Sequence, residues 1–475
     1  MELNHDLVRI EYFHLFIIGL LFIQSLSHRV QKLRVARWLP VMAGMAVVVA
    51  LMNFNIHGEM LYGAYRIDKL SQFFKVMVTI GFFVAVLNAS RQPTLLREKR
   101  ADYFLLMSLS AFGLIILASA VELITVYLAM ELSSYSLYAI VALRNRERCA
   151  AEAAVKYILF GAAATALALY GFSYIMAIQH TSYLPELATR SWNWLTHPMA
   201  VIGLTLFMCG MFYKLALFPF HFWAPDVYQG ASNETATYIA TLPKLGVLVI
   251  LIRLAALVPG PQVTLVIAIL SAISMTYGNL AALAQTDLKR LLGYSAVAHA
   301  GYLMVGLVAG TLAGLDAAAF YALAYILMSF ACFWVICRVA ADGRNLVLED
   351  LNGLYKRAPV LAFVLAVSAF SLVGLPPTAG FMGKLFLLTA AWDHGYNWLV
   401  IVAAVNTAIS IYYYLGLVRH AYTLDETSTP PAVQREPFFS NVWALVLALL
   451  VILLGTVPGP VFDVAVNASS QLMAR

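Results

Sequence analysis

The chain has 475 residues, of which 62% are hydrophobic and only 11% are charged. Soluble domains carry about 25% charged residues, so this composition excludes a soluble globular protein and indicates a polytopic membrane protein. The formal net charge is +6 at pH 7, yet the basic residues sit in short loops instead of forming a nucleic-acid surface interleaved with aromatic residues. The sequence also lacks glycine-rich nucleotide motifs and CxxC spacing, so nothing supports a dinucleotide, zinc or iron–sulfur site on this chain.

Apolar runs long enough to cross a bilayer follow one another with only short polar joints. Taking about 20 residues per crossing, we expect about fourteen transmembrane helices in a single membrane domain. The expected spans are 10–27, 36–54, 71–89, 102–119, 121–142, 152–178, 199–218, 234–256, 262–283, 289–309, 315–338, 358–388, 397–418 and 438–458. The first run follows Glu2 and Asp6 instead of a basic segment, so we expect it to be retained and not cleaved.

The basic residues between the expected spans predict their orientation. Joints after odd-numbered spans hold Arg29, Lys32, Arg34, Arg37, Arg91, Arg97, Lys99, Arg100, Arg144, Arg146, Arg148, Lys289, Arg290, Arg338, Arg344, Lys356, Arg357, Arg419 and Arg435. The even-numbered joints and the two ends hold only Arg9, Arg66, Lys69, Arg190 and Arg475. Because basic loops stay in the cytoplasm, we expect the odd-numbered joints to be cytoplasmic and both termini to lie outside.

Ionisable residues deep inside the apolar spans are the candidates for function. A charge at the centre of a bilayer costs at least about 2.5 to 3.5 kcal/mol on insertion scales, so it is kept where it pairs, faces water or acts. The deep residues are Glu131, Lys214, Lys244, His299 and Lys384. Such a row of titratable groups suits a proton relay through hydrated cavities better than a substrate pocket. Snorkelling to the interface, with a structural role, is the favoured interpretation for three residues nearer the span ends, Lys75, Lys156 and Arg253.

Several of these residues also have a purely structural interpretation. Glu131 and Lys214 carry opposite charges, so they can pair as a switch or as a static lock between two helices. His299 can pass protons in either direction, but a lone histidine on a helix is often only packed and hydrogen-bonded. His221 is a weaker candidate, and the run of tyrosines at 412–414 is more typical of packing or interfacial anchoring.

Two expected spans are interrupted in a related way. Pro219 breaks the seventh span shortly after Lys214, and the segment Gly374–Lys384, with two adjacent prolines, breaks the twelfth. These spans are five apart, and an odd offset inverts one unit relative to the other across the membrane, as in many transporters. We therefore expect an all-helical membrane protein with two inverted five-helix units. The units cover 102–256 and 262–422, with three flanking helices in 1–101 and a last helix in 438–475.

Four strings carry a family resemblance: Ala129–Ser134, Tyr213–Ala231, Gln285–Ser295 and Gly374–Lys384. They resemble the antiporter-like membrane subunits of the proton-pumping NADH:quinone oxidoreductase, respiratory complex I, and the similarity covers nearly the whole chain. Two features resemble those of the N-type subunits in this family. One is Lys384 in the twelfth span, and the other is the end of the chain soon after the fourteenth span. Multisubunit sodium/proton antiporters share the fold and are the alternative. A membrane subunit whose buried charges only fix helix packing is a third possibility.

The resemblance implies a role for each deep residue. Glu131 and Lys214 match the ion pair of the family, and Lys244 matches its central lysine. Lys384 matches the lysine associated with exchange to the far side, and His299 matches a histidine between the two. Protons would pass along this row while redox chemistry in other subunits drives the change in pairing.

The resemblance also implies partners and a location. No cofactor is expected on this chain, whereas NADH, FMN, iron–sulfur clusters and quinone are expected in partner subunits. The expected neighbours are the antiporter-like M subunit and small K- and J-type subunits, in a bacterial inner membrane with both termini periplasmic. One departure from the family is Glu234, which replaces part of an uncharged run containing proline. This carboxylate either takes up protons at the cytoplasmic end of the eighth span or faces a neighbouring loop.

Overall fold

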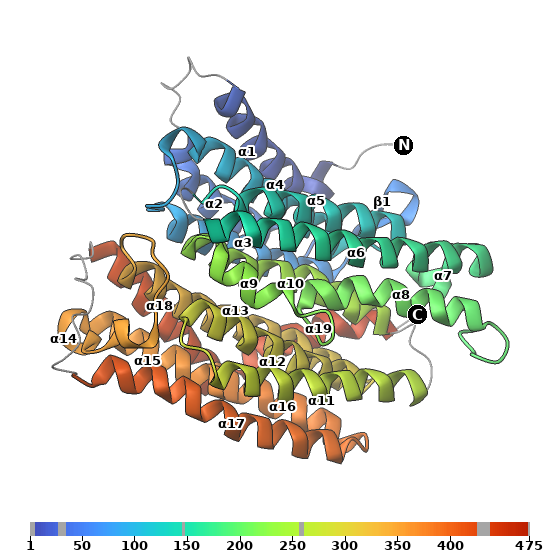
Figure 1. Cartoon of the computed structure of the whole chain (residues 1–475). Helices are drawn as coiled ribbons and strands as arrows, with labels where there is room; N and C mark the ends of the chain where they lie inside the picture. The colour runs from blue at the N-terminus through green and yellow to red at the C-terminus, as the bar shows by residue number, and fades with distance from the viewer. Residues whose placement is uncertain (1–4, 27–34, 145–147, 256–260, 425–437, 474–475) are drawn as a thin grey trace.

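The protein is a bundle of long helices that run side by side (Figure 1). The computed structural model describes residues 5–26, 35–144, 148–255, 261–424 and 438–473. Among these residues, thirteen helices are long and apolar enough to cross a membrane. Seven residues used in the sequence-based argument on topology and the first span lie outside the described part of the chain: Glu2, Arg29, Lys32, Arg34, Arg146, Arg435 and Arg475.

The helices follow the expected apolar runs closely. The first half contains α1 (Arg9–Leu26), α2 (Val35–Met52), α3 (Lys69–Ala89), α4 (Arg100–Ser119), α5 (Leu123–Val141), α6 (Arg148–Gln179), α7 (Leu184–Ala188), α8 (Pro198–Leu215), α9 (Trp223–Gly230) and α10 (Asn233–Ala255). The second half contains α11 (Pro261–Leu283), α12 (Leu288–Val308), α13 (Leu312–Val339), α14 (Leu354–Arg357), α15 (Pro359–Val373), α16 (Ala379–Asp393), α17 (Asn397–Tyr422), α18 (Phe438–Thr456) and α19 (Gly459–Met473). Short 3-10 turns occur at His5–Val8, Leu61–Gly63, Arg97–Lys99 and Leu348–Leu351. The predicted helical membrane fold is therefore confirmed.

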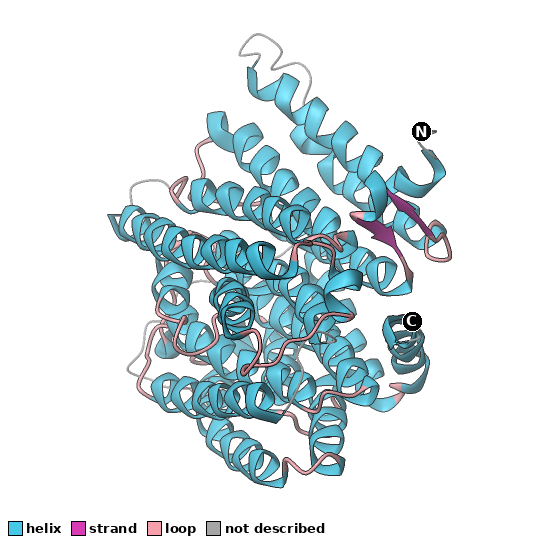
Figure 2. Cartoon of the chain, turned by 90° about the vertical axis from the view of Figure 1, so that its right-hand side faces the viewer, coloured by secondary structure: helices cyan, strands magenta, loops and turns pink. Residues whose placement is uncertain are grey.

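Two small elements lie outside the expected spans. Strands β1 (Gly58–Met60) and β2 (Tyr65–Ile67) form an antiparallel hairpin in which Gly58 lies opposite Ile67 (Figure 2). Helix α19 follows the last expected span, and its 15 residues include the polar Asp463 and Asn467. Both elements are shorter than the roughly 20 residues of a crossing, so a search for membrane spans does not detect them.

Three helices form the interior of the bundle. In α10, α12 and α13, 94% of the most apolar 18-residue stretch is buried inside the protein, compared with 28% in α1 and α2. These three helices pack against one another in the middle of the bundle (Figure 1). A side chain on them is shielded from lipid as well as from bulk water, so its polar groups need partners inside the protein.

Both predicted helix breaks are present. Helix α8 ends at Ala216, which has a left-handed backbone with φ 62°, and α9 resumes the path after a short turn. The expected twelfth span consists of two helices, α15 and α16, separated at Gly374 with φ 90°. Glycine is required there because a Cβ would also lie only 3.0 Å from Cδ of Lys384. The break therefore brings a helix end close to a buried lysine.

The basic residues near the span ends form ion pairs instead of snorkelling. Lys75 Nζ lies 2.6 Å from Glu11 Oε1 and its side chain is fully buried, so the snorkelling interpretation is wrong for this residue. The guanidinium of Arg253 donates two hydrogen bonds of 2.9 Å to Asp68, which begins α3. These short, direct pairs fix α1 to α3 and α3 to α10.

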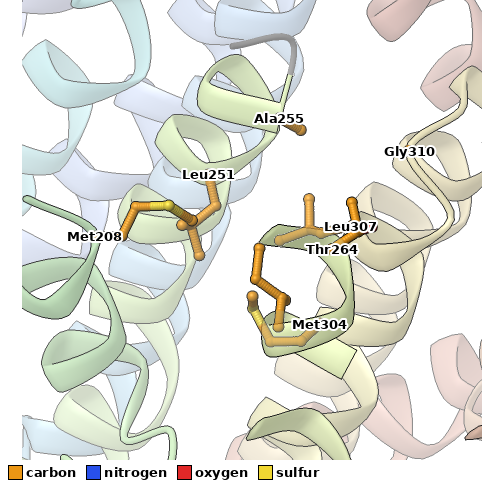
Figure 3. Close-up of a pocket in the computed structure, with 8 residues that line it drawn as sticks. Met208, Leu251, Ala255, Thr264, Met304, Leu307 and Gly310 are labelled. Carbon is orange, nitrogen blue, oxygen red and sulfur yellow. The ribbon is translucent and has the colours of Figure 1, made fainter. Parts of the chain in front are cut away.

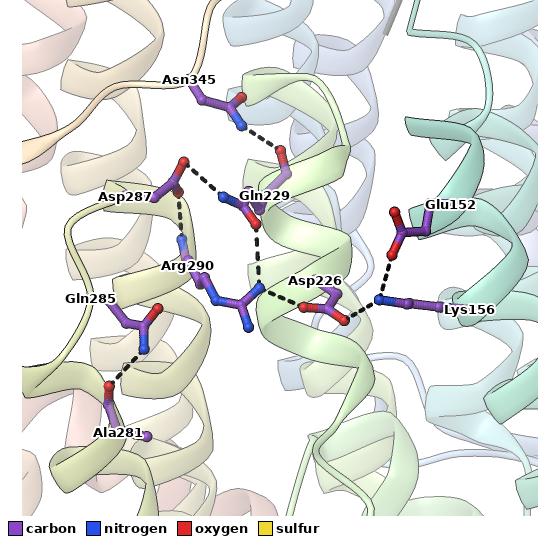
Figure 4. A network of polar contacts seen from close by, with 9 residues as sticks. All are labelled: Glu152, Lys156, Asp226, Gln229, Ala281, Gln285, Asp287, Arg290 and Asn345. Atoms are coloured by element: carbon purple, nitrogen blue, oxygen red, sulfur yellow. Dashed lines mark hydrogen bonds and ion pairs between the residues drawn. The ribbon is translucent and has the colours of Figure 1, made fainter. Parts of the chain in front are cut away.

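A cluster of charged residues holds the short helix α9 between α6 and α12 (Figure 4). Asp226 on α9 accepts a hydrogen bond of 2.8 Å from Lys156 on α6 and one of 2.5 Å from Arg290 on α12. Lys156 also pairs with Glu152, and Arg290 also contacts Gln229. Burial raises the pKa of the Asp226 carboxyl, but the hydrogen bonds and charges of Lys156 and Arg290 outweigh this effect and hold its pKa below the ordinary value.

We predict that Asp226→Asn lowers the thermal stability of the purified protein. The carboxylate is one-quarter exposed, so solvent screening limits the expected loss to about 1 kcal/mol. Because folding lowers the pKa of Asp226, its contribution is present above its unfolded-state pKa and disappears as the pH falls through the lowered folded-state pKa. Melting temperatures measured in detergent at neutral and acidic pH test both statements.

The matched control is Asp393→Asn, which removes an exposed carboxylate at the end of α16. It should melt like the unmodified protein at both pH values. Equal melting temperatures for Asp226→Asn and the unmodified protein at neutral pH would contradict the role of Asp226 in holding α9.

Candidate functional site

Glu131 and Lys214 face each other between α5 and α8. Lys214 Nζ lies 3.9 Å from Glu131 Oε1, and both side chains are buried. Each charge also has a neutral partner: Thr165 donates a hydrogen bond of 2.9 Å to Glu131, and Lys214 donates to the hydroxyl of Ser134 and, over 3.3 Å, to that of Tyr138. The two charged groups are therefore farther apart than in a direct salt bridge, and each is also stabilised by a neutral hydroxyl partner.

Lys244 is held without a carboxylate. Its Nζ donates a hydrogen bond of 2.9 Å to the Tyr325 hydroxyl and lies 3.4 Å from the carbonyl oxygen of Ala296. It also lies 4.7 Å from the centre of the Tyr325 ring, whose face stabilises a cation. These partners are neutral, so the amine can lose its proton without leaving a buried anion unpaired.

His299 lies between two tyrosine hydroxyls. Its Nδ1 is 2.6 Å from the Tyr321 hydroxyl on α13, and its Nε2 is 3.1 Å from the Tyr414 hydroxyl on α17. In a neutral imidazole one nitrogen donates and the other accepts, so the ring can take a proton on one side and release one on the other. The ring of Tyr325, the partner of Lys244, lies 5.2 Å away between ring centres.

Lys384 caps the broken end of α15. Its Nζ donates a hydrogen bond of 2.8 Å to the carbonyl oxygen of Val373, the last residue of that helix, and lies 3.5 Å from that of Leu372. These carbonyls have no partner in the helix and carry the negative end of its dipole, which stabilises an ammonium group. The Tyr302 ring covers the same nitrogen at 4.1 Å from its centre.

Tyrosines join three of the predicted residues into one row. Lys244, His299 and Lys384 are linked through Tyr325 and Tyr302, whose ring centres lie 5.2 and 6.1 Å from that of His299. Glu131 and Lys214 form a separate group, since no hydrogen bond among the described side chains connects Lys214 to Lys244. His221 belongs to neither group, because it packs between aromatic rings, including Phe218 at 5.4 Å.

The tyrosine partners are functional candidates that the sequence interpretation missed. Tyr321 and Tyr325 lie four residues apart and so share one face of α13, a spacing that could have identified them. The run 412–414 divides in three ways: Tyr414 bonds His299, Tyr413 donates to Asn279 over 2.9 Å, and Tyr412 is 76% exposed. Packing or anchoring therefore describes only part of that run.

An apolar cleft lies apart from these residues (Figure 3). Its lining comes from α8, α10, α11 and α12, with one glycine that follows α12, and consists of Met208, Leu251, Ala255, Thr264, Ile267, Met304, Leu307 and Gly310. The lining includes no charged group, so the cleft cannot bind or release a proton. Among the described residues, no cluster of three histidine, cysteine or acidic side chains is arranged to hold a metal ion.

Comparison with known proteins gives the family. Residues 120–410 match the family described as NADH:quinone oxidoreductase/Mrp antiporter, transmembrane. The chain is 60% identical over 462 residues to NADH-quinone oxidoreductase subunit N 2 of Solidesulfovibrio magneticus, which covers 96% of this chain and 98% of the relative. It is 42% identical over 458 residues to subunit N 2 of Opitutus terrae, with 95% of each chain covered.

The solved structures agree with this assignment. A chain of respiratory complex I from Thermus thermophilus with bound Aureothin superposes with a TM-score of 0.85 at 32% identity, over 97% of this chain and 100% of that chain. A chain of the Mrp complex from Dietzia sp. superposes with a TM-score of 0.87 at 18% identity, over 100% of this chain and 98% of that one, which shows a common fold alone. The chain therefore belongs to the family of N subunits of NADH-quinone oxidoreductase.

Proposed function

We propose that Glu131, Lys214, Lys244, His299 and Lys384 form the proton path of a membrane subunit of NADH:quinone oxidoreductase. The observation that carries this proposal is the buried row in which tyrosines link Lys244, His299 and Lys384. A hydroxyl group can accept a proton on its oxygen and release its own. The Tyr325 hydroxyl bonds Lys244, and the Tyr321 and Tyr414 hydroxyls bond His299, whereas the contacts of His299 with Tyr325 and Tyr302 are between rings. The row then moves charge through the protein without exposing an ion to lipid.

The Glu131 and Lys214 pair controls this row in the proposed mechanism. The two charges are 3.9 Å apart and each has a second, neutral partner, so the lysine can leave the carboxylate at moderate cost. Movement of that ammonium toward the interior changes the electric field at Lys244, because charges interact strongly in a medium of low dielectric constant. A proton is thereby bound or released at Lys244, passes by His299 and leaves by Lys384.

The driving reaction takes place in partner subunits. In this proposal, NADH, FMN, iron–sulfur clusters and quinone bind to those subunits. The proposed neighbours of this chain are the antiporter-like M subunit and small K- and J-type subunits. Support comes from the relatives, which are named as N subunits of NADH-quinone oxidoreductase. The N subunit contributes the proton path and its partners contribute the electron transfer.

The proposed orientation places the basic loops in the cytoplasm and both termini in the periplasm of a bacterial inner membrane. In support, Arg144 after α5 bonds the Gly343 carbonyl and the Asn345 side chain after α13, so two basic loops meet at one end of the bundle. The first described turn packs beside the β hairpin at the opposite end (Figure 1). The broken pairs α8–α9 and α15–α16 support the two proposed inverted units, 102–256 and 262–422.

We predict that Lys214→Ala abolishes or strongly reduces proton pumping coupled to quinone reduction. Without the ammonium, Glu131 has no cation to release and the field at Lys244 no longer changes. NADH-driven quinone reduction and proton uptake, measured in the same membranes at matched subunit levels, should fall together.

The matched control is the double variant Glu11→Gln/Lys75→Met, which removes another buried glutamate–lysine pair outside the row. It should keep pumping. Normal pumping by Lys214→Ala would contradict the proposal. Unchanged quinone reduction together with loss of sodium-dependent proton exchange would instead favour the function of a cation/proton antiporter.

We also predict that Tyr325→Phe lowers proton pumping several-fold while the complex still assembles. The substitution keeps the Tyr325 ring beside Lys244 and His299 and removes only the hydroxyl that accepts a hydrogen bond from Lys244. Tyr238→Phe is the control, because it removes a buried hydroxyl that bonds the Met107 carbonyl on α4, outside the row. The ratio of protons moved to quinone reduced should drop in Tyr325→Phe alone, and equal ratios in both variants would exclude Tyr325 from the path.

A further inference from the structure

Helix α10 carries a second buried ionisable residue besides Lys244. Glu234 lies in its first turn with only 4% of its surface exposed, and its Oε2 has no hydrogen-bond partner among the described residues. Lys244 follows ten residues later on the same helix, which corresponds to about 15 Å at 1.5 Å per residue. The central lysine is thus aligned with a buried carboxylate at the end of α10 where the basic loops meet.

The residues between them form a polar stripe. Glu234, Thr237, Thr241 and Lys244 follow one another at spacings of three, four and three, which places all four on one face of the helix. The two threonine hydroxyls each donate a hydrogen bond of 2.7 Å to the carbonyl four residues earlier, so their oxygens can still accept one. The stripe provides polar atoms at every turn between the carboxylate and the lysine.

Neighbouring helices add polar groups to this stripe. Asn88 on α3 donates toward the Thr237 hydroxyl over 3.3 Å and toward the sulfur of Cys337 on α13 over 3.2 Å. The hydroxyl of Thr237 also lies 3.7 Å from that sulfur. The face of α10 between Glu234 and Lys244 therefore meets polar side chains from two further helices and not a continuous apolar wall.

The charged surroundings of Glu234 are mostly basic. The titratable groups that face it are Lys289 on α12, Arg338 and Cys337 on α13, and Tyr103 on α4, with Arg144 close by on the carbonyls that end α9. Lys289 donates a hydrogen bond of 2.6 Å to the Ala231 carbonyl instead of to Glu234. Glu234 forms no direct ion pair among the described residues, and its hydrogen bonds come from its own backbone and from Ser232.

We propose that Glu234 takes up protons at the basic end of α10 and delivers them to Lys244 along the stripe of Thr237 and Thr241. The carboxylate binds a proton from water, the proton moves along hydroxyl groups, and the neutral amine of Lys244 becomes an ammonium. Glu234 returns to a carboxylate and the step is balanced without any other reactant. The inference rests on the proposed function, because it requires Lys244 to carry protons.

The test compares Glu234→Gln with Glu234→Asp in membranes that contain the whole complex. Glu234→Gln keeps the shape but cannot carry a proton, so proton pumping per quinone reduced should fall several-fold. The deficit should grow as the pH rises, because protons become scarcer at the uptake site. Glu234→Asp should retain most of the activity, and Thr237→Val should reproduce the loss in part.

Asp316→Asn is the matched control, since it removes a buried carboxylate that bonds Ser469 in α19, away from the stripe. It should pump normally. Normal pumping by Glu234→Gln at every pH, with Lys244→Met defective, would overturn the role of Glu234 and keep the proposed function. Normal pumping by Lys244→Met would overturn both. Equal loss of assembled complex in the Gln and Asp variants would show a structural role and also overturn the inference.

Discussion

The cost of placing a charge where neither water nor lipid headgroups can reach it governs the interior of this protein. Each buried ammonium needs compensation, and the structure supplies it in different ways. Lys214 has a carboxylate and two hydroxyls, Lys244 has a hydroxyl and an aromatic face, and Lys384 has the end of a helix. The helices that carry these residues and their partners pack closely, because the compensating atoms must lie within hydrogen-bond distance. Packing and the placement of the buried charges are therefore parts of one arrangement.

The broken helices serve the same requirement. An unbroken helix uses its carbonyls internally, whereas a helix that ends inside the membrane leaves its last carbonyls for another partner. At the end of α15 that partner is Lys384, and Gly374 gives the chain the backbone and the space to turn there. At the end of α8 the chain turns at Ala216 and continues into α9, which Asp226 fixes to two neighbouring helices. Each break places a helix end beside a buried lysine, which is Lys214 at α8 and Lys384 at α15.

The helical membrane fold and the burial of the charged residues could be predicted from the sequence for a clear physical reason. A lysine such as Lys244 inside an apolar run is conspicuous because its cost is high, and apolar runs mark the spans by their length alone. The tyrosine partners are different, because Tyr325 in an apolar helix looks the same in sequence whether it packs or bonds a lysine. Its role depends on which helices meet, and that information is not in the local pattern. The same limit applies to Lys75, since its pairing with Glu11 depends on the contact between two flanking helices.

Geometry distinguishes the charges that hold the bundle together from those that can change state. Lys75 with Glu11 and Arg253 with Asp68 are direct pairs at 2.6 and 2.9 Å, in which neutralising either partner would leave the other charge buried and uncompensated. In the row, by contrast, the lysines have hydroxyl, carbonyl and aromatic partners that remain satisfied when the amine is neutral. A lysine held by neutral partners leaves no buried counter-charge uncompensated when it loses its proton. That property is what a proton carrier requires and what a structural salt bridge excludes.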